Sequence, residues 1–237
     1  MSVSHRMEFM QLIDLATISR KHFFFFVNRC NEAYRSGHDL ELYRELISLH
    51  REYDDIKKLL DYDEFLRMLH KTLEEWDMNK RGARLTSLDN LQVSVLSYRD
   101  HIADLYKYKL YDDIYDDLAN IKKLAKKLFC NLAIMDSKRR IVGVSKALHF
   151  LLPDLIMPID SKYTMTAFYG YNKYQNSAEK EFEDFWDIIE KSSEIAERLE
   201  LKPEDANGEV WRLSVPKLID NAIIGLWNSK REEILAL

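Results

Sequence analysis

Glycine and proline are scarce in this chain, and their scarcity constrains the fold more than any other feature. The 237 residues include six glycines and four prolines. A sheet protein reverses direction every several residues and relies on these two residue types at its turns. Leucine, glutamate, lysine, aspartate and tyrosine dominate instead. We therefore predict an all-α protein built as a multi-helix orthogonal bundle.

Apolar residues recur at spacings of three and four through most of the chain, as amphipathic helices require. The pattern predicts long helices over residues 8–34, 40–60, 177–201 and 215–227, with shorter helices between them. Four adjacent phenylalanines, Phe23 to Phe26, cover all sides of the first helix and predict a central position for it. Because no clear linker is present, we expect a single domain over residues 1–237. A division into residues 1–105 and 106–237 is the alternative.

The sequence indicates neither a membrane span nor a metal or cofactor site. Its strongest apolar run, Phe23 to Val27, is far shorter than the roughly 18 residues that a membrane helix needs. Cys30 and Cys130 lie in apolar helical runs without a CxxC motif, so we expect reduced thiols in a cytoplasmic protein. The histidines are scattered over the predicted helices without the i, i+4 pairing of a metal-binding helix. No phosphate-binding loop is present, so we expect no cofactor.

One basic run stands out from the formal net charge of −5 of the whole chain. Its eight cations are Lys122, Lys123, Lys126, Lys127, Lys138, Arg139, Arg140 and Lys146. The only acid between Ile121 and His149 is Asp136, so this stretch carries a formal charge of +7. One interpretation is a phosphate-binding surface, and the alternative is a solvated helix face. Lys138, Arg139 and Arg140 favour phosphate binding, since they lie in a turn directly before the next helix.

The helix after this turn carries two polar side chains among apolar ones. We expect Ser145 to be its N-cap residue. Its apolar stripe contains Ala147, Leu148, Leu151 and Leu152. Lys146 and His149 fall on the other side, so we expect both to face a cleft or a partner. The alternative is that the Lys146 amine reaches solvent and that His149 hydrogen-bonds a backbone carbonyl group.

Asp160 follows a tight apolar loop that contains Pro153 and Pro158, and it precedes a short predicted helix. It is either a helix cap or a catalytic carboxylate beside the basic turn. Lys162 adds a cation two residues later. On the last predicted helix, Lys217 is a candidate for the same cleft, with a solvent-exposed position as the alternative.

Residues 140–164 follow a distinctive order: a short apolar-Gly-apolar turn, a helix, a proline-containing loop and a Pro-x-Asp-Ser step that opens a helix. This order is similar to the helix-hairpin-helix DNA glycosylase superfamily. The resemblance implies that residues 143–145 form a hairpin turn whose backbone N–H groups bind a DNA phosphate. It also implies that Asp160 serves catalysis at the glycosidic bond. Ser145 stands where the second hairpin glycine is expected, and Lys146 lies one place before the lysine nucleophile of the bifunctional members.

Three further stretches, WDMNKRGARL, SKALHFLLPDLIMPIDSKYT and PKLIDNAIIG, resemble an uncharacterised family of prokaryotic hypothetical proteins. That resemblance implies no chemistry. We expect binding of DNA or another nucleic acid, with glycosylase-like chemistry at Asp160 and Lys146 as its enzymatic extension. The predicted nucleic-acid-binding residues are Lys138, Arg139, Arg140, Gly143, Ser145 and Lys162, with Lys146 adjoining them. The alternative is a helical protein-protein interaction module without catalytic activity that docks an acidic partner through the apolar helix and the basic face.

Overall fold

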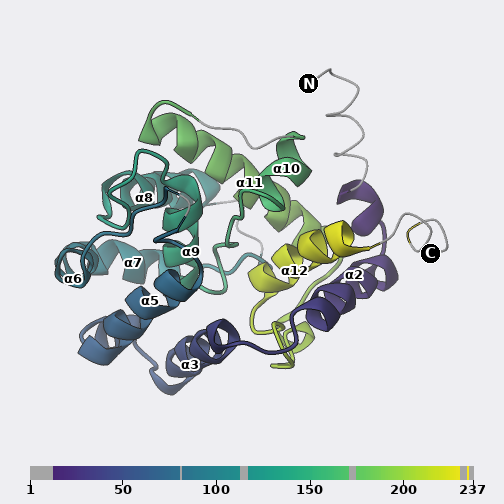
Figure 1. Cartoon of the computed structure of the whole chain (residues 1–237), viewed down its shortest axis with the longest axis horizontal. Coiled ribbons are helices and arrows are strands. Elements are labelled where there is room, and N and C mark those ends of the chain that lie inside the picture. Colours follow the sequence, from purple (N-terminus) through teal and green to yellow (C-terminus); the bar gives the residue numbers. More distant parts are fainter. Residues whose placement is uncertain (1–12, 81, 113–116, 171–174, 230–233, 235–237) are drawn as a thin grey trace.

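The computed structural model describes residues 13–80, 82–112, 117–170, 175–229 and 234. The fold is all-α, as predicted, and the helices pack as a bundle (Figure 1). They are α2 (Arg20–Ala33), α3 (His38–Glu52), α4 (Ile56–Leu60), α5 (Asp63–Glu75), α6 (Leu88–Ser97), α7 (Arg99–Tyr106), α8 (Leu118–Asn131), α9 (Ile141–Leu151), α10 (Thr164–Tyr169), α11 (Ala178–Arg198) and α12 (Val215–Asn228). A short 3₁₀ turn spans Pro203–Asp205.

Polar capping residues divide two of the helices that apolar spacing predicted as continuous. α2 begins only after Ser19, whose side chain accepts a hydrogen bond from the backbone N of His22 at 3.3 Å. The predicted helix over residues 8–34 is therefore interrupted: residues 13–16 are helical, residues 17–19 are not, and residues 8–12 lie outside the described part of the chain. The predicted helix over residues 40–60 is interrupted before Asp55, which caps α4 by accepting from the backbone N of Lys57 at 2.9 Å. A cap ends a helix even where the apolar period continues.

The two C-terminal helices begin within one residue of the starts that the apolar spacing predicts. Ser177 caps α11 by accepting from the backbone N of Lys180, and Ser214 caps α12 by accepting from the backbone N of Lys217. The helix predicted over residues 215–227 agrees with α12 to within one residue at its C-terminal end.

α2 packs along α12, and the two helices lie side by side in Figure 1. Phe23 and Phe26 are completely buried. Phe24 and Phe25, in contrast, remain half-buried, and the guanidinium groups of nearby arginines lie over their rings. The prediction that α2 is surrounded on all sides is therefore wrong. Arginine covers these rings through cation–π contacts where no helix does.

The buried apolar side chains between Ile13 and Leu226 form one contiguous cluster. α9 is the most enclosed of the long helices, because all of its residues except Val142 are buried. It contacts α5, α8 and α11. None of the helices in the described ranges combines the length and the apolar character required to cross a bilayer.

We predict that Gly225→Ala separates α2 from α12. A Cβ atom at this position would lie 1.8 Å from the backbone O of Phe26, and backbone atoms cannot yield as a flexible side chain does. Overpacking of this kind costs about 1–3 kcal/mol in the free energy of unfolding. Denaturant unfolding measures this loss. Glu194→Ala, at an exposed position of α11, is the control, and an equal effect of both substitutions would contradict the close approach.

Candidate functional site

A cleft with a volume of about 740 Å³ opens between residues of α2, α9 and α12, the segment after α5, and the loop before α10. This volume lies in the range of small-molecule and cofactor sites. Lys146, Asp160 and Lys217, which are far apart in the sequence, all line it. The cleft therefore brings three of the predicted functional residues together.

Lys146 lies at the wall of the cleft with only 9% of its surface exposed. Its Nζ donates to the backbone O of Trp76 at 3.1 Å and lies 5.4 Å from the centre of the Trp76 ring. Burial lowers the pKa of Lys146 below its usual range, and the carboxylates of Asp160 and Asp220 oppose this change. Among the described residues, the Trp76 carbonyl is its only hydrogen-bond acceptor. The expectation that Lys146 faces a cleft agrees with this placement.

Lys217 also lines the cleft, and it is 4% exposed. Its Nζ lies 2.5 Å from Oδ2 of Asp220 and donates to Oδ1 of Asn221 at 2.9 Å. Burial raises the pKa of Asp220, and the neighbouring Lys217 opposes this change. The solvent-exposed alternative for Lys217 is thus wrong. A buried pair of opposite charges is costly to assemble, and it is costlier still to break by removing one partner.

Asp160 is a cap, one of the two roles expected for it, and its side chain also lies at the cleft. Its Oδ1 accepts from the backbone N of Lys162 at 2.7 Å and of Tyr163 at 3.1 Å, so it caps the turn that leads into α10. The same half-buried side chain lines the cleft. Its second oxygen, Oδ2, has no hydrogen bond to any described residue. Asp160 is therefore held rigidly through one oxygen while the other is available to a ligand.

The predicted hairpin turn at residues 143–145 is not a turn. These residues lie inside α9, which begins at Ile141, so the prediction of Ser145 as N-cap is also wrong. A Cβ atom on Gly143 would lie 2.3 Å from Sδ of Met135, which explains the glycine by close packing. The Oγ of Ser145 accepts from the backbone N of Ile159 at 3.1 Å. Ser145 thereby ties the loop that carries Asp160 to α9.

Two backbone N–H groups at the start of α9 are already bound. Glu181 on α11, which is 2% exposed, accepts from the backbone N of Arg140 at 2.8 Å and of Ile141 at 3.2 Å. A carboxylate at a helix N-terminus satisfies the amide groups and the helix dipole that would otherwise attract a phosphate. No local pattern in the sequence indicates this role of Glu181, because it lies 40 residues downstream of Ile141 on another helix.

Arg140 is anchored within the protein rather than presented to a ligand. Its guanidinium group donates to the backbone O of Cys130 at 2.9 Å and of Leu132 at 2.5 Å, near the end of α8. Neither Arg140 nor Ser145 nor Lys162 lines the cleft. Lys138, Arg139 and Gly143 do line it, and both cations are exposed.

The remaining cations of the basic run are spread over other contacts. The Nζ atoms of Lys122 and Lys126 each lie 3.1 Å from a carboxylate oxygen of Glu183 on α11. The Nζ of Lys127 lies 2.7 Å from Nε2 of His101. The solvated-face interpretation therefore describes the lysines of α8 better than a phosphate-binding surface does.

His149 does not face the cleft, so the prediction that it is a cleft residue is wrong. It is completely buried, with Nδ1 2.6 Å from the backbone O of Ile156 and Nε2 2.7 Å from the hydroxyl group of Tyr43. Because a carbonyl oxygen can only accept, Nδ1 carries the proton and Nε2 accepts from Tyr43. This is the alternative interpretation, in which His149 hydrogen-bonds a backbone carbonyl group.

Four aromatic residues that the sequence analysis did not single out line the cleft: Tyr34, Trp76, Tyr163 and Trp211. The hydroxyl groups of Tyr34 and Tyr163 are 3.1 Å apart, and Nε1 of Trp211 donates to the backbone O of Tyr34 at 2.7 Å. Each of these rings comes from a different segment of the chain. No local pattern could have indicated that they meet.

Within the described ranges, no three His, Cys, Asp or Glu side chains are grouped so that they could hold a metal ion. Comparison of the chain with protein-family models, with curated proteins and with solved structures finds no match.

Two buried histidines predict that the fold loses stability in acid. Burial lowers the pKa of His50 to about 4 and that of His149 to about 3. Between the ordinary histidine pKa of 6.5 and these values, the unfolded chain binds protons that the folded chain does not. The contribution of each histidine is therefore complete above pH 6.5 and declines as the pH falls toward 4 for His50 and 3 for His149. The slope is about 1.4 kcal/mol per pH unit for each histidine.

Denaturant unfolding between pH 7.5 and pH 4 measures this slope. His149→Asn keeps an amide donor near the backbone O of Ile156 but cannot take up the proton, so the slope becomes shallower. His38→Asn, at an exposed position, keeps the slope of the unmodified protein. A slope unchanged by His149→Asn would contradict the assignment.

Proposed function

We propose that the protein binds nucleic acid over the mouth of the cleft and takes one base into it, where Asp160 acts on the glycosidic bond. The observation that carries this proposal is the convergence of Lys146 and Asp160 on one aromatic-walled cleft. A cytoplasmic location, in which the free thiols of Cys30 and Cys130 stay reduced, belongs to the same proposal.

The aromatic walls support a base as the ligand. Enzymes that act on a base take it out of the stack and hold it between aromatic side chains in a pocket. Stacking on such side chains is worth about 1–3 kcal/mol per base. Tyr34, Trp76, Tyr163 and Trp211 provide rings of this kind around the cleft.

The charges of the cleft fit a neutral base better than a highly charged small molecule. The described lining residues include five acids, Asp39, Glu75, Asp77, Asp160 and Asp220, and five cations, Lys80, Lys138, Arg139, Lys146 and Lys217. Lys138 and Arg139 are the exposed cations contributed by the basic turn, and they suit contacts with the phosphates of the strand. Glu181 binds the backbone N–H groups of Arg140 and Ile141, and residues 143–145 form no hairpin. In this proposal the phosphate contacts therefore come from side chains.

Asp160 has the freedom that the chemistry requires. When an N-glycosidic bond is hydrolysed, the base leaves with the bonding electron pair and water adds to the sugar carbon, releasing one proton. A carboxylate stabilises the developing positive charge on the sugar and can accept the proton from water. The Oδ2 atom of Asp160 is suited to both tasks, since Oδ1 is already engaged in the turn.

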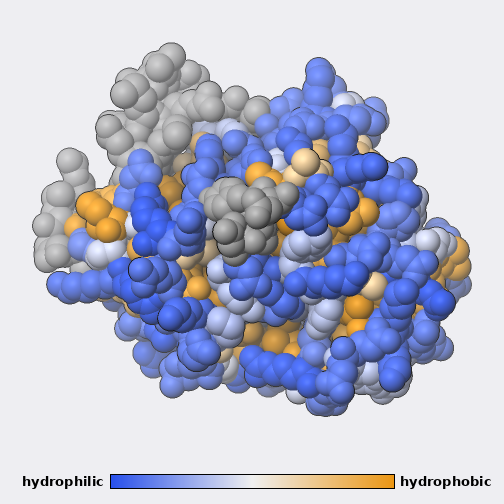
Figure 2. Space-filling model, turned by 180° about the vertical axis from the view of Figure 1, so that it is seen from behind, coloured by the Kyte–Doolittle hydropathy of each residue, from blue (hydrophilic) through white to orange (hydrophobic). Residues whose placement is uncertain are grey.

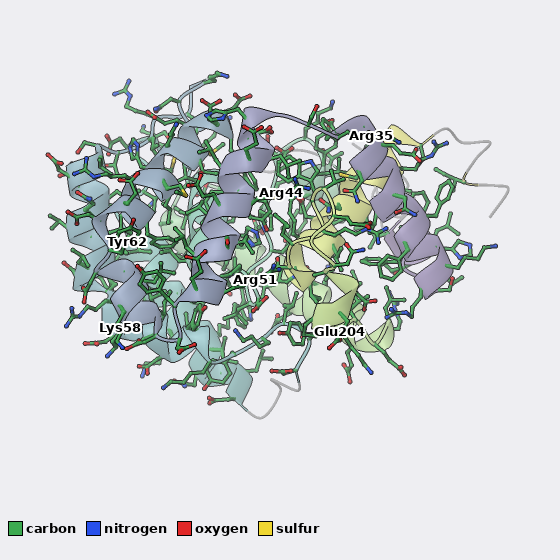
Figure 3. All side chains as sticks on the ribbon, turned by 90° about the horizontal axis from the view of Figure 1, so that it is seen from below. Arg35, Arg44, Arg51, Lys58, Tyr62 and Glu204 are labelled. Atoms are coloured by element: carbon green, nitrogen blue, oxygen red, sulfur yellow. The ribbon has the colours of Figure 1, made fainter. Side chains whose placement is uncertain are left out.

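The alternative, a module that docks an acidic protein, has less support. α9 is enclosed by the core and offers no apolar face to a partner. Apolar residues occupy small separate areas on the face drawn in Figure 2. On the side drawn in Figure 3, the exposed cations Arg44 and Arg51 of α3 alternate with exposed acids of the same helix.

Nucleic-acid binding predicts a steep dependence of affinity on salt. Fluorescence anisotropy with a single-stranded DNA oligonucleotide between 50 and 200 mM salt, concentrations chosen for the strength of screening, measures it. Lys138→Ala and Arg139→Ala each reduce the salt slope by about one unit. Lys122→Ala is the matched control, because Lys122 is paired with Glu183 away from the cleft. Undetectable binding to single-stranded and duplex DNA at low salt would refute the proposal.

Catalysis predicts that Asp160→Asn abolishes release of free base from DNA while the fold keeps its stability. Asparagine caps a turn about as well as aspartate, so the bonds from Lys162 and Tyr163 survive. Asp160→Ala loses them as well and costs about 0.5–2 kcal/mol. Chromatography of released bases and denaturant unfolding separate the two effects. Full activity of Asp160→Asn would restrict Asp160 to the role of a cap.

A further inference from the structure

Two donor groups at the cleft, on Lys146 and Trp76, have more N–H bonds than acceptors among the described residues. Lys146 uses one N–H, toward the backbone O of Trp76. An ammonium group carries three N–H bonds and a neutral amine two, so at least one remains in either state. The indole N–H of Trp76, which also belongs to the cleft lining, is buried and has no acceptor among the described residues.

Lys217, the other buried amine of the cleft, already donates to two acceptors. Its Nζ is already engaged by Asp220 and Asn221, and the amide group of Asn221 donates in turn to the backbone O of Trp211 at 3.0 Å. The Asp220 carboxylate binds Lys217 through Oδ2. Lys146 remains as a buried donor facing the open space of the cleft.

We propose that Lys146 recognises the keto oxygen at C4 of a pyrimidine or C6 of a purine, so that the cleft selects keto bases such as uracil and hypoxanthine over amino bases such as cytosine and adenine. The inference rests on the proposed function, since it names the class of base that the same cleft takes. It assigns Lys146 to recognition of the base rather than to attack on the sugar.

The physical reason is the opposite hydrogen-bonding character of the two classes of base. A keto oxygen accepts a hydrogen bond, whereas the exocyclic amino group of cytosine or adenine donates. An amino group placed against Lys146 would bring two donors together and leave both without partners. A site that is built to satisfy a polar group rejects an analogue that leaves its buried groups unpaired. The difference between cytosine and uracil at this position is the replacement of one amino group by one oxygen.

The test compares two single-stranded oligonucleotides that consist of deoxyadenosine except for one central deoxyuridine or deoxycytidine. Binding is measured in the Asp160→Asn background, so that cleavage does not consume the probe, by quenching of tryptophan fluorescence. The deoxyuridine strand binds more tightly by about tenfold, the size expected for one discriminating hydrogen bond. Lys146→Met removes the donors and abolishes the preference. Lys146→Gln reduces it, because an amide both donates and accepts.

Lys138→Ala is the matched control, since it weakens binding of both strands by a similar factor and leaves their ratio unchanged. Circular dichroism establishes that each variant is folded. Equal binding of the two strands, tighter binding of the deoxycytidine strand, or a preference that survives in Lys146→Met would overturn the inference and leave the proposed function standing. Binding of neither strand would overturn the proposed function, and the inference with it.

Discussion

A neutral imidazole in the core holds together the elements that form the cleft. His149 on α9 donates to the backbone O of Ile156 and accepts from the hydroxyl group of Tyr43 on α3. These two bonds join the helix that carries Lys146 to α3 and to the loop that leads to Asp160. Both ring nitrogens are satisfied by the neutral imidazole, and burial lowers its pKa far below the usual range. Protonation would break one of these connections.

A second set of polar contacts places Asp160 relative to Lys146. Ser145, adjacent to Lys146 in the chain, accepts from the backbone N of Ile159, adjacent to Asp160. Glu181 fixes the start of the same helix by binding two backbone N–H groups. The cleft is thus supported by buried hydrogen bonds whose partners are distant in sequence. Groups held in this way keep their geometry when a ligand replaces water.

Lys146 and Lys217 differ in the partners that their amines contact. Lys217 is neutralised by Asp220 at 2.5 Å, and the two form an internal pair beneath Trp76 and Trp211. Lys146 has no carboxylate within ion-pairing distance among the described residues and meets only a carbonyl oxygen. Lys217 is therefore held within the protein, while the amine of Lys146 retains an N–H group without an acceptor among the described residues.

The sequence by itself determined the fold class, the starts of α11 and α12, and the candidacy of Lys146, Asp160 and Lys217. The fold class and the helix starts can be predicted because the spacing of apolar residues depends only on neighbours within a few positions of the chain. Only the tertiary structure decided that residues 143–145 are helical, that His149 is internal, and that four aromatic rings surround the cleft. These outcomes depend on partners far away in the chain, such as Tyr43 for His149 and Glu181 for the start of α9. Spacing along the sequence carries no information about such partners.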